Sequence, residues 1–476
     1  MKTLREKYFV HINDDKVAAA KDMQSANEYI KNSTATFTRG ILSMMAIPKM
    51  HTEESFSIIK TALETTHNIL DKIIECYLAD SQLQALFPFD ERLKKLILLP
   101  KQYNQNLPIC RLDIFFNEDD YSFKFCEFNA DGASAMNEDR EIYNAFKNSR
   151  LYQKMGEEYH IESFELFDSW VSEFLTLYKE YSQNKNTHQK SIDHQDKHNQ
   201  QENNSNPQSS ITPNPTIAIV DFLDIGTKSE FKVFRDAFIR CGLNCTIEDI
   251  TTLKYDGKNL TTDEGVIIDA IYRRAVTSEC MDKYETIQPF INAVMDGNVC
   301  LVGAFRTQII HDKNLFRLLR HPYIKQILTN EENNFIESHI PKTYLLNHGE
   351  YDKIAVLNDK NNWIIKPSDR YGSFDVHTGG DYQDIDWYNL IKEYENKGFV
   401  LQEYCPPFRT QDTYFQDDTQ ICDNYGYMTG IFLYNGKVKG LYTRCMLNRT
   451  TTQKDEGRVT TTLLLTPKNT TLLSKN

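Results

Sequence analysis

The spacing of apolar residues changes along the chain and predicts a succession of helical and extended regions. Over residues 56–75, apolar side chains recur near a 3.6-residue period, and residues 1–107 are predicted to be mainly helical. Residues 108–129 instead hold two runs in which apolar and polar side chains alternate around an acidic turn, which predicts a β-hairpin. Helical spacing with a core-facing aromatic stripe returns over residues 138–180.

The middle of the chain passes from a polar stretch into a strand–helix–strand pattern. Residues 182–215 are almost all Asn, Gln, Ser, His, Lys and Pro, which cannot bury enough apolar surface to offset chain entropy, so we expect a disordered linker or insertion. An apolar strand over 216–221, a helix over 230–240, and strands over 266–272 and 298–302 follow. This alternation predicts a parallel α/β domain over residues 216–310.

The last third of the chain adds a helix that opens at Asp312-Lys313-Asn314 and short apolar strands over 363–367 and 399–404. The whole pattern predicts a mixed α/β (α+β) fold. Its expected divisions are residues 1–107, 108–181, 182–215, 216–310 and 311–476.

Composition limits the classes of partner. The chain has 476 residues, a formal net charge of −13 and no basic stripe, so nucleic acid is not an expected partner. No segment approaches the ~20 consecutive apolar residues of a membrane span, and no signal peptide is expected. The ten Cys are scattered without a CxxC pair, which favours reduced thiols in a cytoplasmic protein over a zinc site or disulfide framework.

The predicted hairpin carries the strongest chemical signal. Arg111 and Asp113 lie two apart on its first strand, and Glu127 and Asn129 two apart on its second, so each pair points to one side of its strand. If the strands pair, one face carries a guanidinium, two carboxylates and an amide. Hard oxygen ligands suit Mg²⁺ shared with nucleotide phosphates, and an adjacent Arg suits a phosphoryl oxygen. The alternative interpretation is an ordinary solvated hairpin face.

Weaker signals for phosphate binding lie in the C-terminal third. Lys366 ends an apolar strand and needs an anion beside it, either a phosphate or a carboxylate. The Gly372-Ser373 turn that follows offers backbone N–H groups to phosphate oxygens. The strand ending at Gln402-Glu403-Tyr404 can present backbone groups to an adenine edge. Neither a Walker A sequence nor GxGxxG occurs.

Two arginines, Arg273 and Arg274, follow the strand expected over residues 266–272. Basic side chains at the carboxyl end of a parallel strand often line a ligand crevice, so both are candidate substrate residues. A surface arginine pair is the alternative.

Taken as an ordered set, these motifs resemble an ATP-grasp ligase. Lys313, Ile-Ile-Lys366-Pro, Tyr-Gly372-Ser and Leu-Gln402-Glu403 resemble its nucleotide-binding half, and the two hairpin strands resemble its metal-binding strands. Here the metal strands precede the lysines, whereas most ATP-grasp enzymes have the reverse order. The inverted order resembles the circularly permuted group typified by glutathionylspermidine synthase, whose Glu-x-Asn-Ala-Asp signature is similar to Glu127-Phe-Asn-Ala-Asp131.

The resemblance covers residues ~108–145 and ~216–450 and has two departures. The group's Pro after Asn-Ala-Asp is replaced by Gly132-Ala-Ser, and the phosphate-covering loop has only Gly372. The helical first region lacks a Cys/His amidase domain, so amidase activity is not expected. Segments around Asp269–Arg274 and Gly430–Arg444 also resemble the group.

The resemblance implies an ADP-forming carboxylate–amine ligase with a circularly permuted ATP-grasp fold and a preATP-grasp-like parallel domain. It implies that two Mg²⁺ ions are held by Asp113, Glu127 and Asn129, and that Arg111 holds the acyl phosphate. It also implies that ATP is bound through Lys313, Lys366, Gly372, Ser373, Gln402, Glu403 and Tyr404. Arg444 is a catalytic candidate together with Arg111 and would anchor a substrate carboxylate or phosphate, with a surface salt bridge as the alternative. The candidate substrate residues are Asp131, Arg273 and Arg274.

Two competing functions follow from the same motifs. One is a catalytically degenerate scaffold that binds nucleotide or a peptide, and the other is an ATP-dependent phosphotransferase. The expected partners are a small carboxylate and a small amine, and the acidic surface mildly favours a cationic amine such as a polyamine. The sequence identifies neither substrate, and it does not reveal an oligomeric state.

Overall fold

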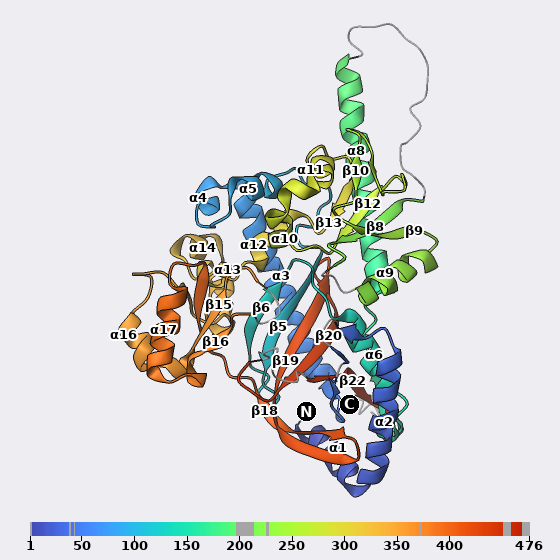
Figure 1. Ribbon diagram of the computed structural model, residues 1–476, viewed down its shortest axis with the longest axis vertical. Coiled ribbons are helices and arrows are strands. Elements are labelled where there is room, and N and C mark those ends of the chain that lie inside the picture. Colours follow the sequence, from blue (N-terminus) through green and yellow to red (C-terminus); the bar gives the residue numbers. More distant parts are fainter. Residues whose placement is uncertain are drawn as a thin grey trace, which may run out of the picture. The chain divides into compact units, whose positions relative to one another are not determined.

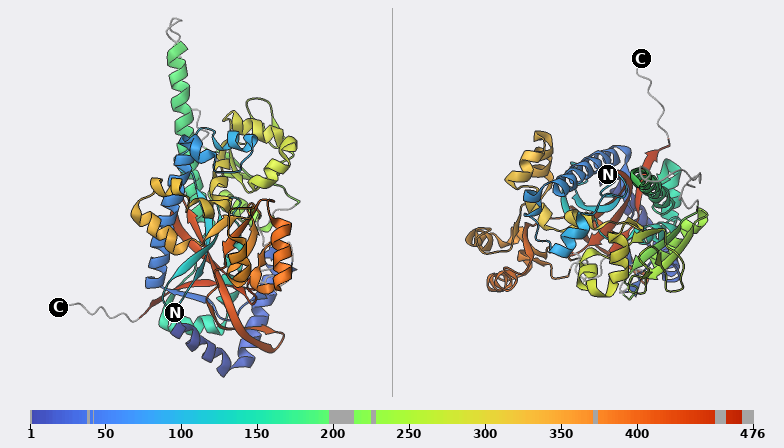
Figure 2. Two further views of the ribbon diagram at one scale, coloured as in Figure 1. Left: turned by 90° about the vertical axis from the view of Figure 1, so that its left-hand side faces the viewer. Right: turned by 90° about the horizontal axis from the view of Figure 1, so that it is seen from above.

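The structure is a computed structural model that describes residues 2–37, 40–41, 43–196, 214–224, 228–370, 374–450 and 458–468 (Figures 1 and 2). The chain forms two compact units. The first comprises Met1–Pro88, Ile109–Glu165 and Ile309–Asn476, and the second comprises Phe89–Pro108 and Leu166–Gln308. The expected segment 108–181 is therefore divided, because the helix that begins at Asp168 belongs with the parallel sheet of the second unit.

The first unit is built on a seven-stranded sheet in the order β3-β21-β20-β19-β5-β6, with β18 paired to β19. All its pairs are antiparallel except β21 with β3. Its strands are β3 (Ser43–Met44), β5 (Ile109–Phe116), β6 (Phe123–Asn129), β18 (Arg409–Gln416), β19 (Thr419–Tyr434), β20 (Lys437–Met446) and β21 (Arg458–Thr460). The predicted hairpin over residues 108–129 is present as β5 and β6.

The turn of this hairpin is closed by local hydrogen bonds. The Asn117 backbone N–H donates to the Ser122 carbonyl at 2.8 Å. The Asn117 side-chain oxygen accepts from the Asp119 N–H at 2.9 Å, as Asn and Asp side chains commonly do in turns. Tyr121 takes a positive φ of 60° to reverse the chain. The acidic run between the strands is therefore a turn, as its composition predicted.

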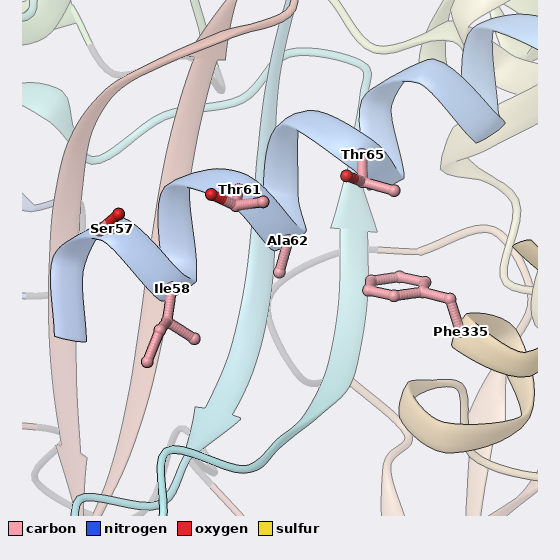
Figure 3. A pocket seen from close by; sticks show the side chains of 6 residues that line it. All are labelled: Ser57, Ile58, Thr61, Ala62, Thr65 and Phe335. Carbon is pink, nitrogen blue, oxygen red and sulfur yellow. The ribbon is translucent and has the colours of Figure 1, made fainter. Parts of the chain in front are cut away.

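Helix α3 (Glu53–Ala79) crosses the strands of this sheet, as Figure 3 shows. A capping box between Thr52 and Ser55 begins it, and Glu53 and Glu54 complement the helix dipole in its first turn. Its apolar positions include Ile59, Leu63, Ile73 and Ile74, all fully buried. The predicted 3.6-residue pattern over 56–75 thus corresponds to one long amphipathic helix.

A second sheet of the first unit, in the order β14-β17-β15-β16, holds the expected strands over 363–367 and 399–404. They are β15 (Trp363–Pro367) and β17 (Phe399–Glu403), beside β14 (Thr343–Leu345) and β16 (His377–Thr378). Helices α16 (Lys353–Asn358) and α17 (Asp384–Tyr394) cover it, with Trp387 and Ile391 fully buried in the shared core. This small layer positions Lys366.

The other elements of the first unit are mostly short. The helices are α1 (Lys2–Asp14), α2 (Lys16–Asn32), α4 (Ser81–Gln84), α6 (Met136–Phe146), α7 (Arg150–Glu158), α12 (Gln308–His311), α13 (Asn314–Leu318), α14 (Pro322–Ile327), α15 (Asn330–His339), η3 (Lys360–Asn362) and η4 (Gly379–Asp381). The strands are β1 (Thr36–Phe37), β2 (Gly40–Ile41), β4 (Lys49–Thr52), β7 (Tyr159–Glu162) and β22 (Thr462–Pro467). The N-terminal region, expected to be mainly helical, therefore also contains strands β1 to β4, which are too short to give a periodic signal.

The second unit contains a parallel sheet in the order β13-β12-β8-β9. Its strands are β8 (Thr216–Asp221), β9 (Asn244–Asp249), β12 (Ala270–Arg273) and β13 (Cys300–Val302), with a small pair β10 (Lys254–Tyr255) and β11 (Leu260–Thr261). Its helices are α5 (Glu91–Ile97), α8 (Asp168–Asp196), α9 (Lys228–Arg240), α10 (Thr277–Asp282), η1 (Tyr284–Ile287), α11 (Gln288–Met295) and η2 (Phe305–Thr307).

Two expectations for this unit need correction. The strand expected over 266–272 is the shorter β12, which ends at Arg273. Helix α8 continues to Asp196, so residues 182–196 are helical and not disordered; Gln and Lys there are good helix formers even without an apolar face. The rest of the expected linker, residues 197–213, lies outside the described residues. In the described part of the chain, no helix is long and apolar enough to cross a bilayer.

Candidate functional site

The β5–β6 register brings the four predicted hairpin side chains onto one face of the large sheet. Arg111 pairs with Asn129, and Asp113 pairs with Glu127. Directly opposed residues of an antiparallel pair point to the same side, so the guanidinium, both carboxylates and the amide are neighbours. A β-bulge follows Asp113, between it and Ile114. Bulges often re-aim side chains beside functional sites.

Arg111 and Asp113 form a two-bond ion pair on this face. Arg111 Nε donates to Asp113 Oδ1 at 2.7 Å and Nη2 donates to Oδ2 at 2.9 Å. The remaining Arg111 nitrogen, Nη1, donates to the Ser134 carbonyl at 2.7 Å. Asn129 Nδ2 donates to Asp113 Oδ2 at 3.0 Å and to Glu127 Oε1 at 3.3 Å. The four side chains therefore form one hydrogen-bonded group.

The ion pair rests on a glycine of the next strand. Gly430 of β19 is the register partner of Asp113. A Cβ at Gly430 would lie 2.7 Å from Arg111 Cδ and 2.8 Å from Asp113 Oδ1, closer than real contacts allow. Sequence reasoning noted Gly430 only within a family-like segment and missed this role. Its signal is a glycine inside a buried strand run, which often marks a close approach.

Two lysines complete the positive side of the site. Lys366 on β15 donates from Nζ to Gln402 Oε1 at 2.9 Å and to the Cys126 carbonyl at 3.3 Å. Lys313, directly before α13, donates from Nζ to the Arg370 carbonyl at 2.7 Å. Both lysines are buried and both act electrostatically on Glu127. The predicted lysines and the predicted metal strands therefore meet in one place.

This charge arrangement sets the ionisation of the two carboxylates. Burial disfavours ionised Glu127, but Lys313, Arg111 and Lys366 prevail and lower its pKa to about 2. Burial raises the pKa of Asp113, against the opposing effect of the Arg111 guanidinium. Glu127 is thus an ionised carboxylate at neutral pH.

Arg444 lies on β20, the strand beyond β19, near the same face. Its Nε donates to Tyr442 Oη at 3.3 Å, and its guanidinium lies 5.7 Å from the Tyr442 ring centroid. Tyr442 is the register partner of Gly430 and so continues the row that begins at Glu127 and Asp113, and Arg444, two residues further along β20, is paired with Met428 and points to the same side of the sheet as Tyr442. Among the described residues Arg444 forms no ion pair, which disfavours the salt-bridge alternative.

The residues expected to contact adenine are already engaged. Gln402 links Lys366 to Thr343, whose Oγ1 accepts from Gln402 Nε2 at 3.0 Å. The Glu403 and Tyr404 backbone N–H groups donate to the Lys342 and Asn362 carbonyls, both at 2.7 Å.

The Glu403 carboxylate also accepts from the Lys342 N–H at 3.1 Å. This segment therefore supports Lys366 and closes the sheet, and an adenine edge would compete with these bonds. Gly372 and Ser373 lie outside the described residues.

Of the candidate substrate residues, Asp131 is buried directly after β6. Arg273 and Arg274 belong to the second unit. Arg273 donates to the carbonyls of Gly303 (2.5 Å) and Ala275 (2.6 Å). Arg274 pairs with Glu230 at 2.8 Å. Both guanidiniums are buried; Arg273 holds two loops of its own unit and Arg274 pairs with helix α9, which favours a structural role over substrate binding.

A Mg²⁺ ion fits the donor set of the first unit's site. The described residues contain no group of three or more His, Cys, Asp or Glu that could hold a metal. Mg²⁺ shared with nucleotide phosphates usually needs only one or two carboxylates, however. Ionised Glu127, Asp113 and the Asn129 amide supply hard oxygen atoms on one face. To bind Mg²⁺, an Asp113 oxygen would have to accept the metal ion in addition to its hydrogen bond from Arg111 or in place of it.

A shallow hollow of about 400 Å³ lies elsewhere in this unit, between α3 and Phe335 of α15 (Figure 3). It is lined by Ser57, Ile58, Thr61, Ala62, Thr65 and Phe335. No charged side chain lines it, so it does not suit a phosphate.

No family model matches the sequence, and neither does any curated protein. Solved structures do match the fold. A glutathione synthetase-like effector from Globodera pallida, in its apo form, aligns with a TM-score of 0.57 over 93% of this chain and 96% of its own, at 11% identity. This chain shares the fold of that effector.

At this identity the likeness concerns the fold alone. The resemblance predicted from the ordered motifs is confirmed to that extent: the chain is a mixed α/β protein whose fold is related to ligase-like proteins. A candidate gamma-glutamylcysteine synthetase from Methylobacillus flagellatus KT aligns over 86% of each chain at 10% identity. Its TM-score of 0.38 is too low to support an argument.

Proposed function

We propose that this chain is an ATP-dependent carboxylate–amine ligase that forms an amide bond through an acyl phosphate and releases ADP. The observation that supports it most is the pairing of Asp113 with Glu127 beside Lys313 and Lys366. Carboxylates for a metal ion and lysines for phosphate oxygens are the combination that a nucleoside triphosphate requires. The proposal includes a circularly permuted ATP-grasp arrangement, with the second unit as its preATP-grasp-like domain.

Each charged side chain has a proposed role. Asp113, Glu127 and Asn129 would hold Mg²⁺, as two ions, against the β- and γ-phosphates. Bound Mg²⁺ would offset the negative charge on the transferred phosphoryl group. Lys313 and Lys366 would bind the α- and β-phosphates, and their carbonyl and amide partners hold both lysines in position beforehand.

The proposed reaction has two steps. In the first, a substrate carboxylate oxygen forms a bond to the γ-phosphorus, the bond to the bridging oxygen breaks, and ADP leaves. In the second, an amine attacks the acyl carbon, phosphate leaves and the amine nitrogen loses a proton. Arg111 would stabilise the phosphoryl oxygens, and Arg444 would bind a substrate carboxylate. Asp131 is the candidate for orienting the amine.

The test is Mg²⁺-dependent stabilisation by ATP, measured as a thermal shift on the wild type and on Glu127→Gln. ATP at 100 times its Kd adds about 2.7 kcal/mol to wild-type stability. Glu127→Gln is expected to lose the Mg²⁺-dependent part of the shift, whereas Glu28→Gln, an exposed change on α2, keeps it. ADP release that requires both an acid and an amine would then identify the ligase. A wild type that ATP and Mg²⁺ do not stabilise would refute it.

The catalytically degenerate scaffold is a second candidate, and one observation favours it. Both Asp113 oxygens accept hydrogen bonds from Arg111, which leaves a metal ion to compete with a two-bond ion pair. Such a scaffold would bind nucleotide without Mg²⁺ dependence and would release no ADP. An ATP-dependent phosphotransferase would release ADP without an amine and leave a stable phosphoester.

A further inference from the structure

Two pairs of oppositely charged side chains are buried together in the first unit, apart from the candidate site. The side chains of Arg5, Lys49, Glu118 and Asp412 are at most 4% exposed. With Tyr427, which is also buried, they are called the buried ionic cluster below. Burying four charges is costly unless each has a partner, so this arrangement calls for an explanation.

The cluster is one connected network. Arg5 Nη1 donates to Asp412 Oδ2 and to Tyr427 Oη, both at 2.9 Å, and Tyr427 Oη itself donates to Asp412. Lys49 pairs with Glu118. Arg5 Nη2 lies 4.0 Å from Glu118 Oε1 and so joins the two ion pairs. Two cations and two anions balance within the cluster.

Its members come from five different places in the fold. Arg5 is on α1, Lys49 on β4, Asp412 on β18 and Tyr427 on β19, while Glu118 lies in the turn of the β5–β6 hairpin. The cluster thus fastens two hairpins, β5–β6 and β18–β19, to the N-terminal elements.

The first two helices add further contacts to the β18–β19 hairpin, beside which they lie in Figure 1. Gln24 donates to Asp418 at 3.0 Å, and Gln420 donates to Asn13 at 3.1 Å. The turn end of this hairpin is therefore held at several points.

The buried parts of the strands that these contacts hold lack the alternation of exposed and buried side chains that usually selects a register. Residues 425–434 of β19 are buried without exception, and β5 is buried at all but Phe115. When one face of a strand is exposed to solvent, a one-residue slip moves the buried apolar side chains onto the solvent face. The free-energy cost of exposing them selects the correct register. With both faces buried, alternation cannot choose the register, and specific polar contacts must do so.

The register matters to the candidate site because only one alignment places Gly430 opposite Asp113. A slip of one residue would bring Thr429 or Ile431 there, and either side chain would collide with the Arg111–Asp113 pair. Tyr427 precedes Gly430 by three residues on the same strand, about 10 Å away. The cluster and the site therefore share β19.

We propose that the buried ionic cluster sets the register of β5 against β19 and thereby positions Arg111 and Asp113 over Gly430. Arg5, Lys49, Glu118 and Asp412 are positioning residues that need not touch a substrate. The consequence for nucleotide binding rests on the proposed function, whereas the consequence for strand pairing does not.

The experiment compares the double variant Lys49→Met/Glu118→Met with the wild type, using the full chain. Replacing both partners of a buried ion pair by apolar side chains is often neutral or stabilising, so Tm is expected to stay within about 3 °C. Amide hydrogen exchange in peptides covering 109–116 and 426–434 is expected to rise about tenfold or more. Binding of Mg²⁺ and ATP is expected to weaken about tenfold or more, because small displacements of such a site are costly.

A matched control is Lys154→Met/Glu157→Met on α7, an exposed ion pair whose side chains are 43% and 63% exposed. It is expected to change neither exchange nor binding. Arg5→Lys is a milder variant that keeps the charge and loses the second guanidinium nitrogen, Nη2, which approaches Glu118, and it is expected to raise exchange in residues 426–434 only.

Wild-type exchange in the folded double variant would overturn the proposal, since the cluster would then stabilise without choosing a register. If the double variant does not fold, wild-type exchange in Arg5→Lys would overturn it equally. Faster exchange together with no ATP binding by the wild type would support the register proposal and refute the proposed function.

Discussion

Gly430 lies opposite Asp113 across the β5–β19 pair, so close that a single added carbon would overlap both Asp113 and Arg111. The two residues are far apart in sequence, and neither constrains the other until the sheet has formed. Because Gly430 has no side chain, the Arg111 guanidinium and the Asp113 carboxylate can approach the backbone of β19 closely.

Gly430→Ala is expected to displace the Arg111–Asp113 pair and to weaken binding of Mg²⁺ and ATP about tenfold or more. Overpacking a buried position typically destabilises by about 1–3 kcal/mol. Isothermal titration and urea unfolding measure the two effects. Gly156→Ala is the control, because Gly156 lies on α7 with nothing within 4 Å of an added Cβ, and it should be neutral or stabilising. If Gly430→Ala binds Mg²⁺ and ATP as tightly as the wild type does, Gly430 is not needed to position the site.

Lys366→Met is expected to weaken ATP binding about tenfold to a hundredfold, because the proposed lysine–phosphate contact is lost and Gln402 loses its partner. Equilibrium binding of ATP with Mg²⁺ present measures it. Lys392→Met, an exposed lysine on α17, should bind ATP like the wild type. Equal affinities in the two variants would remove Lys366 from the phosphate site.

The Glu118 carboxylate predicts acid sensitivity of the fold. Burial opposes its charge, but Lys49 and Arg5 lower its pKa to about 2, well below the ordinary value of 4.5. A depressed folded-state pKa contributes stability that is complete above pH 4.5 and is lost as the pH falls toward 2. The full contribution is on the order of 3 kcal/mol.

Urea unfolding between pH 6 and pH 3 tests this window. Glu118→Gln should flatten the pH dependence below 4.5, whereas Glu6→Gln, an exposed change on the same helix as Arg5, should leave it intact. A pH profile that Glu118→Gln leaves unchanged would show that the ion pair does not control acid stability.

The buried His51 imidazole predicts a second pH range, above that of Glu118, in which acid lowers the stability of the fold. Burial, then the nearby Lys49 charge, lowers the pKa of its imidazole from 6.5 to about 3. The folded state therefore binds fewer protons than the unfolded state, so stability is lost as the pH falls below 6.5. His51→Gln should reduce the slope between pH 6.5 and 4.5, where Glu118 contributes little and where His339 and His377, whose pKa values burial also lowers, supply part of the remainder. His160→Gln, on the exposed side of β7, is the control; a slope in His51→Gln equal to that of the wild type would contradict the assignment.

Alternating polarity was sufficient to predict the β5–β6 hairpin, since it is a local property of residues 108–129. The same pattern predicted which side chains share a face. Short strands such as β3 and β4 could not be predicted from the sequence, because two to four residues do not establish a period. The composition of the polar end of α8 predicts disorder because it offers no apolar face, whereas the structure has a helix there.

The closest contacts of the site could not be predicted in the same way. Gly430 acquires its role only through pairing with a strand more than 300 positions earlier, as the register shows. The buried ionic cluster escaped for a related reason: Arg5, Lys49, Glu118 and Asp412 read individually as surface charges, which such residues usually are. Charge type is visible in a sequence, whereas burial of a charge depends on the finished packing.

The salt bridge between Arg5 and Asp412 joins residues 407 positions apart, so the first unit needs both ends of the chain. During synthesis, α1 emerges early, and Arg5 has no ion-pair partner until β18, which carries Asp412, has been made. The second unit draws on residues 89–308 alone and has all its strands well before then. We therefore expect the parallel sheet to fold first and the site-bearing sheet last, with slow closure of its long-range contacts. A chain interrupted before β19 would contain β5, β6, Lys313 and Lys366 but would lack the strand against which Arg111 and Asp113 pack.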